Sequence, residues 1–370
     1  MNPFKYSDEQ LSQREFMFAF PSVLIGVAIL SLPSDVAKVT SFSDGWVSIL
    51  LAGIIFTLLT ILGLKLAALF PGKSFLTYTS FLISRPVAIT ISIILILLAI
   101  FTTAYSLRSV SFISQQYLFD QTPMEVLALA FLLVVIYAVS GSRAGIFRLN
   151  VLFLPIILLA FIFVVFFNIK WFEVNNLLPL FKSDISEYLH GIKNTFGAYG
   201  GFYLVLFYFT FINNPTKITR KIVFGMSIPI IFYIMIFFAC IAVFGNAVTG
   251  NLTFPTIELA KRVDIPGAVL ERIDALVFTI WIMAIFNTTT ITLDIAVLLL
   301  TSIYKKVKKR IVVFILSPIV YYLSMFPQQI NQVEVAGNFI NIFHIFFTSL
   351  IIIGLFVIAK WRGVKNQGEK

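Results

Sequence analysis

Long apolar stretches alternate with short polar and basic segments along the whole chain. Ten of these stretches are long enough for a helix to cross about 30 Å of hydrocarbon, the thickness of a bilayer core. The pattern therefore predicts an all-α polytopic membrane protein, with residues 1–370 in a single integral membrane domain. The ten predicted spans cover residues 12–38, 46–70, 87–117, 124–141, 145–169, 191–212, 221–246, 267–303, 311–328 and 336–360.

Two of the predicted spans contain sequences that interrupt a helix. Residues 26–33 in the first span read Gly-Val-Ala-Ile-Leu-Ser-Leu-Pro, and residues 197–201 in the sixth read Gly-Ala-Tyr-Gly-Gly. Glycine costs about 1 kcal/mol relative to alanine inside a helix, and proline removes a backbone donor. Within a membrane the freed backbone groups must line a cavity or meet a ligand, so both places are candidate binding sites.

The positions of the two interruptions divide the chain into two halves. Helices 1–5 cover about 12–169 and helices 6–10 cover about 191–360, and each half begins with an interrupted helix. An odd number of spans in each half places the halves in opposite orientations in the membrane. This arrangement is the 5+5 inverted repeat, or LeuT-like core, of secondary transporters.

Composition and charge agree with a membrane protein. Hydrophobic residues make up 59% of the 370 positions and charged residues 12%, a balance that soluble globular domains do not reach. The net charge of +10 is spread over short basic runs between the apolar stretches, which favours contact with membrane lipid and argues against nucleic acid as a partner. The polar N-terminus has no signal-peptide cleavage site, so we expect the first apolar stretch to remain as a membrane helix.

The distribution of lysine and arginine predicts how the spans are oriented. With the N-terminus in the cytoplasm, 19 of the 27 basic residues fall on the cytoplasmic side and 7 on the other, and Arg108 lies inside a span. Positive residues accumulate in the cytoplasmic loops of membrane proteins. We therefore expect both termini to be cytoplasmic.

The first interruption offers backbone donors to an anionic ligand. The amide groups of Gly26, Val27, Ala28 and Ile29, aided by the dipole of the half-helix that follows, can hold a substrate carboxylate without a basic side chain. Gly26 can also serve close helix packing, as small residues do in membranes.

The interruption of the sixth helix can open its backbone toward the amino group of the same ligand. We expect contributions from Gly197, Ala198, Tyr199, Gly200 and Gly201, with the ring of Tyr199 or of Phe202 forming a wall. Glycine-mediated helix packing is again the alternative.

Polar residues in two further spans are candidates for lining the same pocket. Thr102, Tyr105 and Ser106 lie at helical spacing on one face of the third span. Asn287 and Thr288 belong to a polar run in the eighth span, whose hydroxyl and amide groups can line a ligand pocket or coordinate sodium. Threonine hydroxyls in such a run can also bond to carbonyl oxygens one turn back.

Arg108 is a charged residue within the third span, where an unpaired charge is costly. We expect it to form a structural ion pair with Asp120, with Glu125, or with an acid of the pair Glu271 and Asp274. Direct contact with a ligand is the alternative.

Asp294 is the carboxylate that lies deepest in the inner half of a predicted span. A buried acid at such a position can bind a proton or a cation. An ion pair with Lys305 or another inner basic residue is the second interpretation.

No motif for catalysis or metal binding stands out. His190, His344 and Cys240 are isolated from other metal-ligand types, and neither a phosphate-binding glycine loop nor a nucleophile motif is present. We expect a protein that is not an enzyme and that needs neither a metal nor a cofactor.

The chain resembles the B-subunit family of bacterial endospore germinant receptors, the GerAB type, over nearly its whole length. The resemblance is carried by residues 26–33, by Asn-Leu-Leu-Pro at 176–179, by Thr-Phe-Pro at 253–255, and by Leu-Glu-Arg-Ile-Asp-Ala at 270–275 followed by Trp281. It implies a fold of the amino acid–polyamine–organocation superfamily. It also implies a nutrient sensor in the spore inner membrane, acting with a larger A subunit and a lipoprotein C subunit.

Within this family the germinant, commonly an amino acid, is thought to bind between helices 1, 3, 6 and 8. Many members carry an acidic residue just after the glycines of helix 6, whereas Phe202 and Tyr203 stand there in this chain. A side-chain countercharge for an ammonium group is therefore missing at that place. The ligand that we expect is a small neutral amino acid or another small nutrient.

Two other functions stay open. The first is an amino-acid permease coupled to protons or sodium, which is weakened because the middle of the fifth span holds no lysine to serve as a coupling site. The second is a scaffold that binds no nutrient. Polar faces inside the third and eighth spans argue against the scaffold, because buried polar groups are costly without a purpose.

Overall fold

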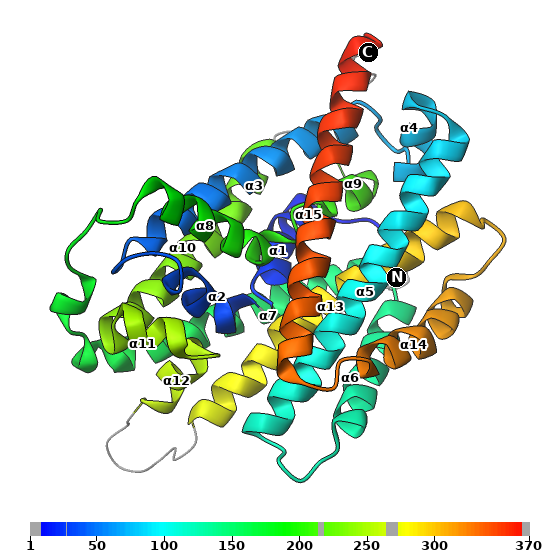
Figure 1. Cartoon of the computed structure of the whole chain (residues 1–370). Coiled ribbons are helices and arrows are strands. Elements are labelled where there is room, and N and C mark those ends of the chain that lie inside the picture. Colours follow the sequence, from blue (N-terminus) through cyan, green and yellow to red (C-terminus); the bar gives the residue numbers. More distant parts are fainter. Residues whose placement is uncertain (1–8, 27, 214–217, 264–272, 365–370) are drawn as a thin grey trace, which may run out of the picture.

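The computed structural model describes residues 9–26, 28–213, 218–263 and 273–364 (Figure 1). Within these ranges every named element is a helix, and one isolated β-bridge pairs Leu11 with Ile212. The predictions made for Val27 and for Glu271 lie outside the described residues.

The helices follow one another in two runs. The first run is α1 (Gln13–Leu24), α2 (Ala28–Ala37), α3 (Gly45–Ala68), α4 (Phe75–Leu82), α5 (Arg85–Tyr117), α6 (Met124–Ser140) and α7 (Arg143–Asn168). The second begins with η1 (Ile169–Trp171), η2 (Val174–Leu177), α8 (Ile185–Thr195), η3 (Phe196–Tyr199), α9 (Leu204–Tyr208) and η4 (Phe209–Phe211). It ends with α10 (Ile218–Phe244), α11 (Asn246–Asn251), α12 (Pro255–Lys261), α13 (Ile273–Ile303), α14 (Lys309–Met325) and α15 (Ile330–Trp361).

Six helices in the described part of the chain are long and apolar enough to cross a membrane: α3, α5, α7, α10, α13 and α15. The pair α1 and α2, bent by 55°, makes a seventh if it is counted as one span. Helices α6 and α14 have 17 residues each, fewer than the 20 or so that usually span a bilayer. The protein is thus an all-helical membrane protein, and a total of ten spans stays a prediction.

Both glycine-containing interruptions coincide with breaks in the helices. Helix α1 ends at Leu24 and α2 begins at Ala28. In the second half, α8 ends at Thr195, and the chain passes through η3 and a turn before α9 begins at Leu204. Residues 196–203 therefore form a 3₁₀-helix and a turn, and contain no α-helix.

Pro33 lies inside α2 rather than at the break. A proline has no N–H, so it leaves the carbonyl of the residue four positions earlier without its helical partner. That carbonyl belongs to Ile29, and it accepts a hydrogen bond of 2.7 Å from the hydroxyl of Thr256 on α12. The proline thus leaves the Ile29 carbonyl free to accept the hydrogen bond that joins α12 to α2.

Helix α13 lies at the centre of the helix packing and is largely buried. It packs against α1, α5, α6, α7, α12 and α14, while α5 also packs against α15 (Figure 1). The hydroxyls of Thr289, Thr290 and Thr292 donate to carbonyl oxygens one turn back at 2.7–2.8 Å. Three threonines of the polar run therefore bond to the backbone of α13 itself.

A buried carboxylate fixes the segment that leads into α8. Asp44, just before α3, accepts hydrogen bonds from the backbone N–H groups of Phe181, Lys182 and Ser183 at 2.6, 2.5 and 2.8 Å. Three such bonds compensate the desolvation of one carboxylate. The start of α8 is thereby held against the corner between α2 and α3.

A second acid strengthens the same junction. The Ser41 hydroxyl lies 3.0 and 3.2 Å from the two carboxylate oxygens of Glu187 on α8. Hydrogen bonds from the hydroxyls of Ser183 and Ser41 hold the pKa of Glu187 below its ordinary value. The ionised carboxylate is the form that fits this contact.

Candidate functional site

A cavity of about 460 Å³ lies at the break between α1 and α2. Its wall combines the break, the 196–204 segment, α5, α13 and α15. The first four of these correspond to the predicted helices 1, 6, 3 and 8.

Three side chains hold the α1 side of the break in place. The Thr288 hydroxyl donates to the Val23 carbonyl at 2.7 Å, and the Tyr233 hydroxyl donates to the Leu24 carbonyl at 2.5 Å. The indole N–H of Trp281 donates to the Gly26 carbonyl at 3.2 Å. These bonds satisfy carbonyl groups that a broken helix would otherwise leave unpaired in the membrane.

The α2 side of the break presents donors instead of acceptors. Gly26 and Ala28 both line the cavity, at the N-terminal end of a 10-residue helix. The first amides of a helix have no intrahelical acceptor, and the helix dipole gives this end a partial positive charge. An anionic group of a ligand is therefore favoured at this wall.

Gly26 is needed because Thr288 approaches it closely. A Cβ atom built at Gly26 would overlap the Thr288 hydroxyl oxygen. The same hydroxyl holds Val23, so a side chain at position 26 must displace a bond that fixes the break.

Most of the residues predicted to bind the ligand meet at this cavity. Ten of the fourteen line it: Gly26, Ala28, Thr102, Tyr105, Ser106, Gly197, Ala198, Gly200, Gly201 and Thr288. They come from four separate parts of the chain, namely the break at the start of α2, α5, the 197–201 segment and α13, which the fold brings to one place.

Three predicted residues lie outside the cavity wall, and each is engaged elsewhere. Ile29 is fully buried beneath α12. The Tyr199 ring stacks on Phe56 at 5.5 Å, and its hydroxyl donates to a backbone carbonyl of α3 at 3.2 Å. Asn287 donates its side-chain amide to the Ser22 hydroxyl at 2.6 Å. These three residues contact other helices and do not face the cavity.

Helix α15 adds residues that the sequence pattern had not singled out. Glu334, Asn338 and Asn341 line the cavity at spacings of four and three residues, which places them on one helical face. That spacing was the available signal. His344, interpreted as an isolated histidine, also lines the cavity.

The ring of His344 connects two parts of the wall. Its Nδ1 lies 3.3 Å from the Thr102 hydroxyl oxygen, and its ring packs on that of Tyr203 with 4.4 Å between centroids. Helices α5 and α15 and the segment after η3 therefore meet at this side chain.

Four charged residues also line the cavity at the helix break. The acids are Asp35 and Glu334, and the bases are Lys38 and Lys193. With both signs present, this part of the cavity does not select strongly for one net charge.

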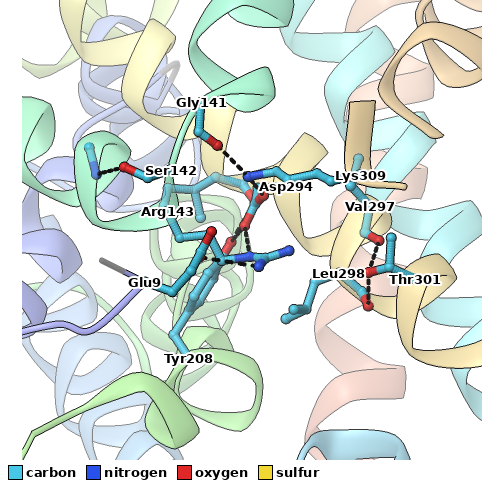
Figure 2. A network of polar contacts seen from close by, with 12 residues as sticks. Glu9, Gly141, Ser142, Arg143, Tyr208, Asp294, Val297, Leu298, Thr301 and Lys309 are labelled. Carbon is cyan, nitrogen blue, oxygen red and sulfur yellow. Dashed lines mark hydrogen bonds and ion pairs between the residues drawn. The ribbon is translucent and has the colours of Figure 1, made fainter. Parts of the chain in front are cut away.

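A network of charged groups surrounds Asp294 of α13, and none of its members lines the cavity at the helix break (Figure 2). One oxygen of this buried carboxylate accepts from Arg143 Nε at 3.0 Å and from the Tyr208 hydroxyl at 2.8 Å. The other forms an ion pair of 3.1 Å with Lys309, and Arg143 also pairs with Glu9 at 3.3 Å. The interpretation as an ion pair with an inner basic residue fits, but the partners are Arg143 and Lys309 in place of Lys305.

The predicted ion pairs of Arg108 do not form among the described residues. Its guanidinium contacts the Met325 sulfur at 3.8 Å, and no ion pair joins it to Asp120, Glu125 or Asp274.

Comparison with known proteins identifies the family. The sequence profile described as "Spore germination protein" matches residues 10–333. Spore germination protein GerLB of Bacillus cereus is 43% identical over 342 residues, 92% of this chain and 91% of that protein. Spore germination protein YndE of Bacillus subtilis (strain 168) is 27% identical and covers 94% of both chains.

Among solved structures, the crystal structure of MhsT in complex with L-phenylalanine superposes with a TM-score of 0.61 at 16% sequence identity. It covers 91% of this chain and 88% of that one. The match shows a LeuT-like fold. With a family profile over most of its length and a relative at 43% identity, the chain belongs to the spore germination protein family of GerAB-type, permease-like membrane subunits.

Proposed function

We propose that the protein is the nutrient-sensing subunit of a spore germinant receptor and that it binds a small neutral amino acid, or a nutrient of similar size, in the cavity at the helix break. The observation that carries the proposal is the pairing of a helix N-terminus, at Gly26 and Ala28, with the glycine-rich segment 197–201 across one cavity. MhsT, whose fold matches, was solved with a bound amino acid.

The two ends of an amino acid would meet different walls. Its carboxylate would lie at the first amides of α2, where the helix dipole stabilises negative charge. Its ammonium group would face the hydroxyls of Thr102 and Ser106 and the exposed backbone near Gly197. The apolar wall of Leu24 and Ile291 suits an uncharged side chain.

The signal would arise from closure of the cavity. A ligand shifts a conformational equilibrium only through its differential affinity for the two states. The broken helices are natural moving parts, because residues 196–203 form a short 3₁₀-helix and a turn in place of α-helix. Closure would be passed to an A subunit and a lipoprotein C subunit in the spore inner membrane, around a ten-span subunit with both termini in the cytoplasm.

Ligand-induced thermal shift tests this proposal. A ligand that binds the folded state stabilises it by RT ln(1 + [L]/Kd), so the purified protein is screened against the common amino acids. We expect a shift with one or a few neutral amino acids, and its loss in Thr288→Val, which cannot hold Val23. Thr279→Val, at an exposed threonine of the same helix, is the matched control. A shift that survives Thr288→Val at wild-type size would place the ligand elsewhere.

An amino-acid permease coupled to protons or sodium is the second candidate, favoured by the match to MhsT. The two basic partners of Asp294 occupy the carboxylate most suited to ion coupling, which weakens this candidate. Accumulation of a labelled amino acid in proteoliposomes, driven by an imposed proton or sodium gradient, would establish the permease.

A further inference from the structure

A second cavity, of about 490 Å³, lies where α5, α6 and α14 meet. It shares no lining residue with the cavity at the helix break. Arg108 and Gln115 of α5, Glu125 of α6, Met325 of α14 and Gln328 beyond it form its wall. Glu125 lies at the start of α6 and Met325 at the end of α14, so the cavity opens at the level where these helices end.

Arg108 brings an unsatisfied cation into this cavity. The residue is only 5% exposed, and its Nε has no hydrogen-bond partner. The contact of its NH1 with the Met325 sulfur, at 3.8 Å, involves a weak acceptor. A buried guanidinium without an anion is unfavourable, and its planar set of donors matches a carboxylate or a phosphate.

Glu125 gives the same cavity a negative group. It is exposed, and it forms no ion pair with Arg108 although both residues line the cavity. Glu125 would repel a ligand that carries only negative charge. A ligand with an ammonium group close to its anionic group would satisfy both side chains.

We propose that this cavity binds a zwitterion, with the anionic group on Arg108 and the ammonium group at Glu125. Two sources carry this chemistry: the headgroup of phosphatidylethanolamine and a free amino acid. Exposed apolar side chains flank the cavity residues in sequence, Val126 on α6 and Tyr322 and Phe326 at the end of α14, with 54%, 69% and 77% exposure. A lipid can lie along this surface, and a small solute can enter from the helix ends.

Chemical labelling of Arg108 reports on ligand binding in this cavity alone, because Arg108 does not line the cavity at the helix break. The full-length protein is placed in phosphatidylglycerol nanodiscs and treated with phenylglyoxal, which modifies arginine, and the modification of each arginine is followed by mass spectrometry. The second sample contains phosphatidylethanolamine, and the third contains phosphatidylglycerol with added alanine. Exposed Arg310, at the other end of α14, is the internal control.

We expect zwitterion to slow modification of Arg108 and to leave Arg310 unchanged. Protection by phosphatidylethanolamine assigns the lipid headgroup, and protection by alanine assigns the free amino acid. Glu125→Gln should weaken binding about tenfold, the usual effect of losing one charge-assisted contact, whereas Asp120→Asn at an exposed acid nearby should not. Modification of Arg108 at the same rate in all three samples, or protection in Glu125→Gln equal to that in the wild type, would overturn the proposal.

Discussion

The Thr288 hydroxyl on α13 occupies the space that a Cβ on Gly26 would need, and it donates to the Val23 carbonyl at 2.7 Å. The Thr288 hydroxyl oxygen is therefore the point of close contact between α13 and the broken helix. A movement of the break changes this contact, which couples the cavity to the central helix of the fold.

Gly26→Ala tests this fit. The added methyl group has to displace the Thr288 hydroxyl, so we expect a loss of stability of about 1–3 kcal/mol, as for overpacking of a core. Thermal unfolding of the purified protein measures it. Gly354→Ala, on α15 where a Cβ meets no atom within 4 Å, is the control and should be neutral or slightly stabilising. Equal unfolding temperatures of Gly26→Ala and the wild type would contradict the fit.

His344→Leu removes the ring that meets Thr102 and Tyr203 at the cavity wall. We expect the affinity for the bound nutrient to fall about tenfold, because one polar contact and one aromatic contact are lost. Titration calorimetry with the ligand found in the thermal-shift screen measures the change. His190→Leu, at an exposed histidine, should bind as the wild type does. Unchanged affinity in His344→Leu would exclude this wall from the binding site.

Asp294→Asn leaves Arg143 and Lys309 without their shared carboxylate. Removing one partner of a buried ion pair typically costs about 3–5 kcal/mol, so the unfolding temperature should fall strongly. The exposed acid Asp184 provides the control variant Asp184→Asn, for which we expect little change. An Asp294→Asn protein as stable as the control would show that the network contributes little to folding.

Glu187 should give the protein a dependence of stability on pH. Because its pKa is lower in the folded protein, the ionised form stabilises the fold above the unfolded pKa of about 4.3. That contribution is lost as the pH falls through the folded pKa. Glu187→Gln should therefore show a smaller loss of melting temperature between neutral and acidic pH than Glu173→Gln, a control at an exposed acid. Identical pH profiles for the two variants would contradict this assignment.

The sequence was sufficient to locate both helix breaks and ten of the residues that line the cavity. Gly26 and the glycines at 197–201 lie in strongly apolar stretches, where the backbone groups that an interruption frees have no water to bond and must face a cavity or a ligand. The same reasoning placed Thr102, Tyr105 and Ser106 at the cavity, because their spacing puts them on one face of α5.

The sequence did not show which of two neighbouring residues on a helix faces the cavity. Asn287 and Thr288 are adjacent, but successive residues on an α-helix point about 100° apart. Thr288 lines the cavity, whereas Asn287 reaches Ser22. Tyr199 lies in the short η3 helix, whose geometry an α-helical pattern does not describe, and its side chain packs against α3.

The sequence did not predict that α15 lines the cavity, because this depends on how the helices pack in the folded protein. Glu334, Asn338 and Asn341 share a face, but nothing in the sequence indicates that this face meets the break between α1 and α2. Similarly, the role of Pro33 became clear only through its effect on the Ile29 carbonyl and the bond from Thr256.

The cavity at the break between α1 and α2 is the place where we propose that a small nutrient binds. The most direct test is titration calorimetry of the purified wild-type protein and of Gly26→Leu with the amino acid that gives the largest thermal shift. We predict saturable binding with one site per chain in the wild type and no detectable binding in a Gly26→Leu protein that is folded and present at normal level. Binding of the same affinity in Gly26→Leu would contradict the account.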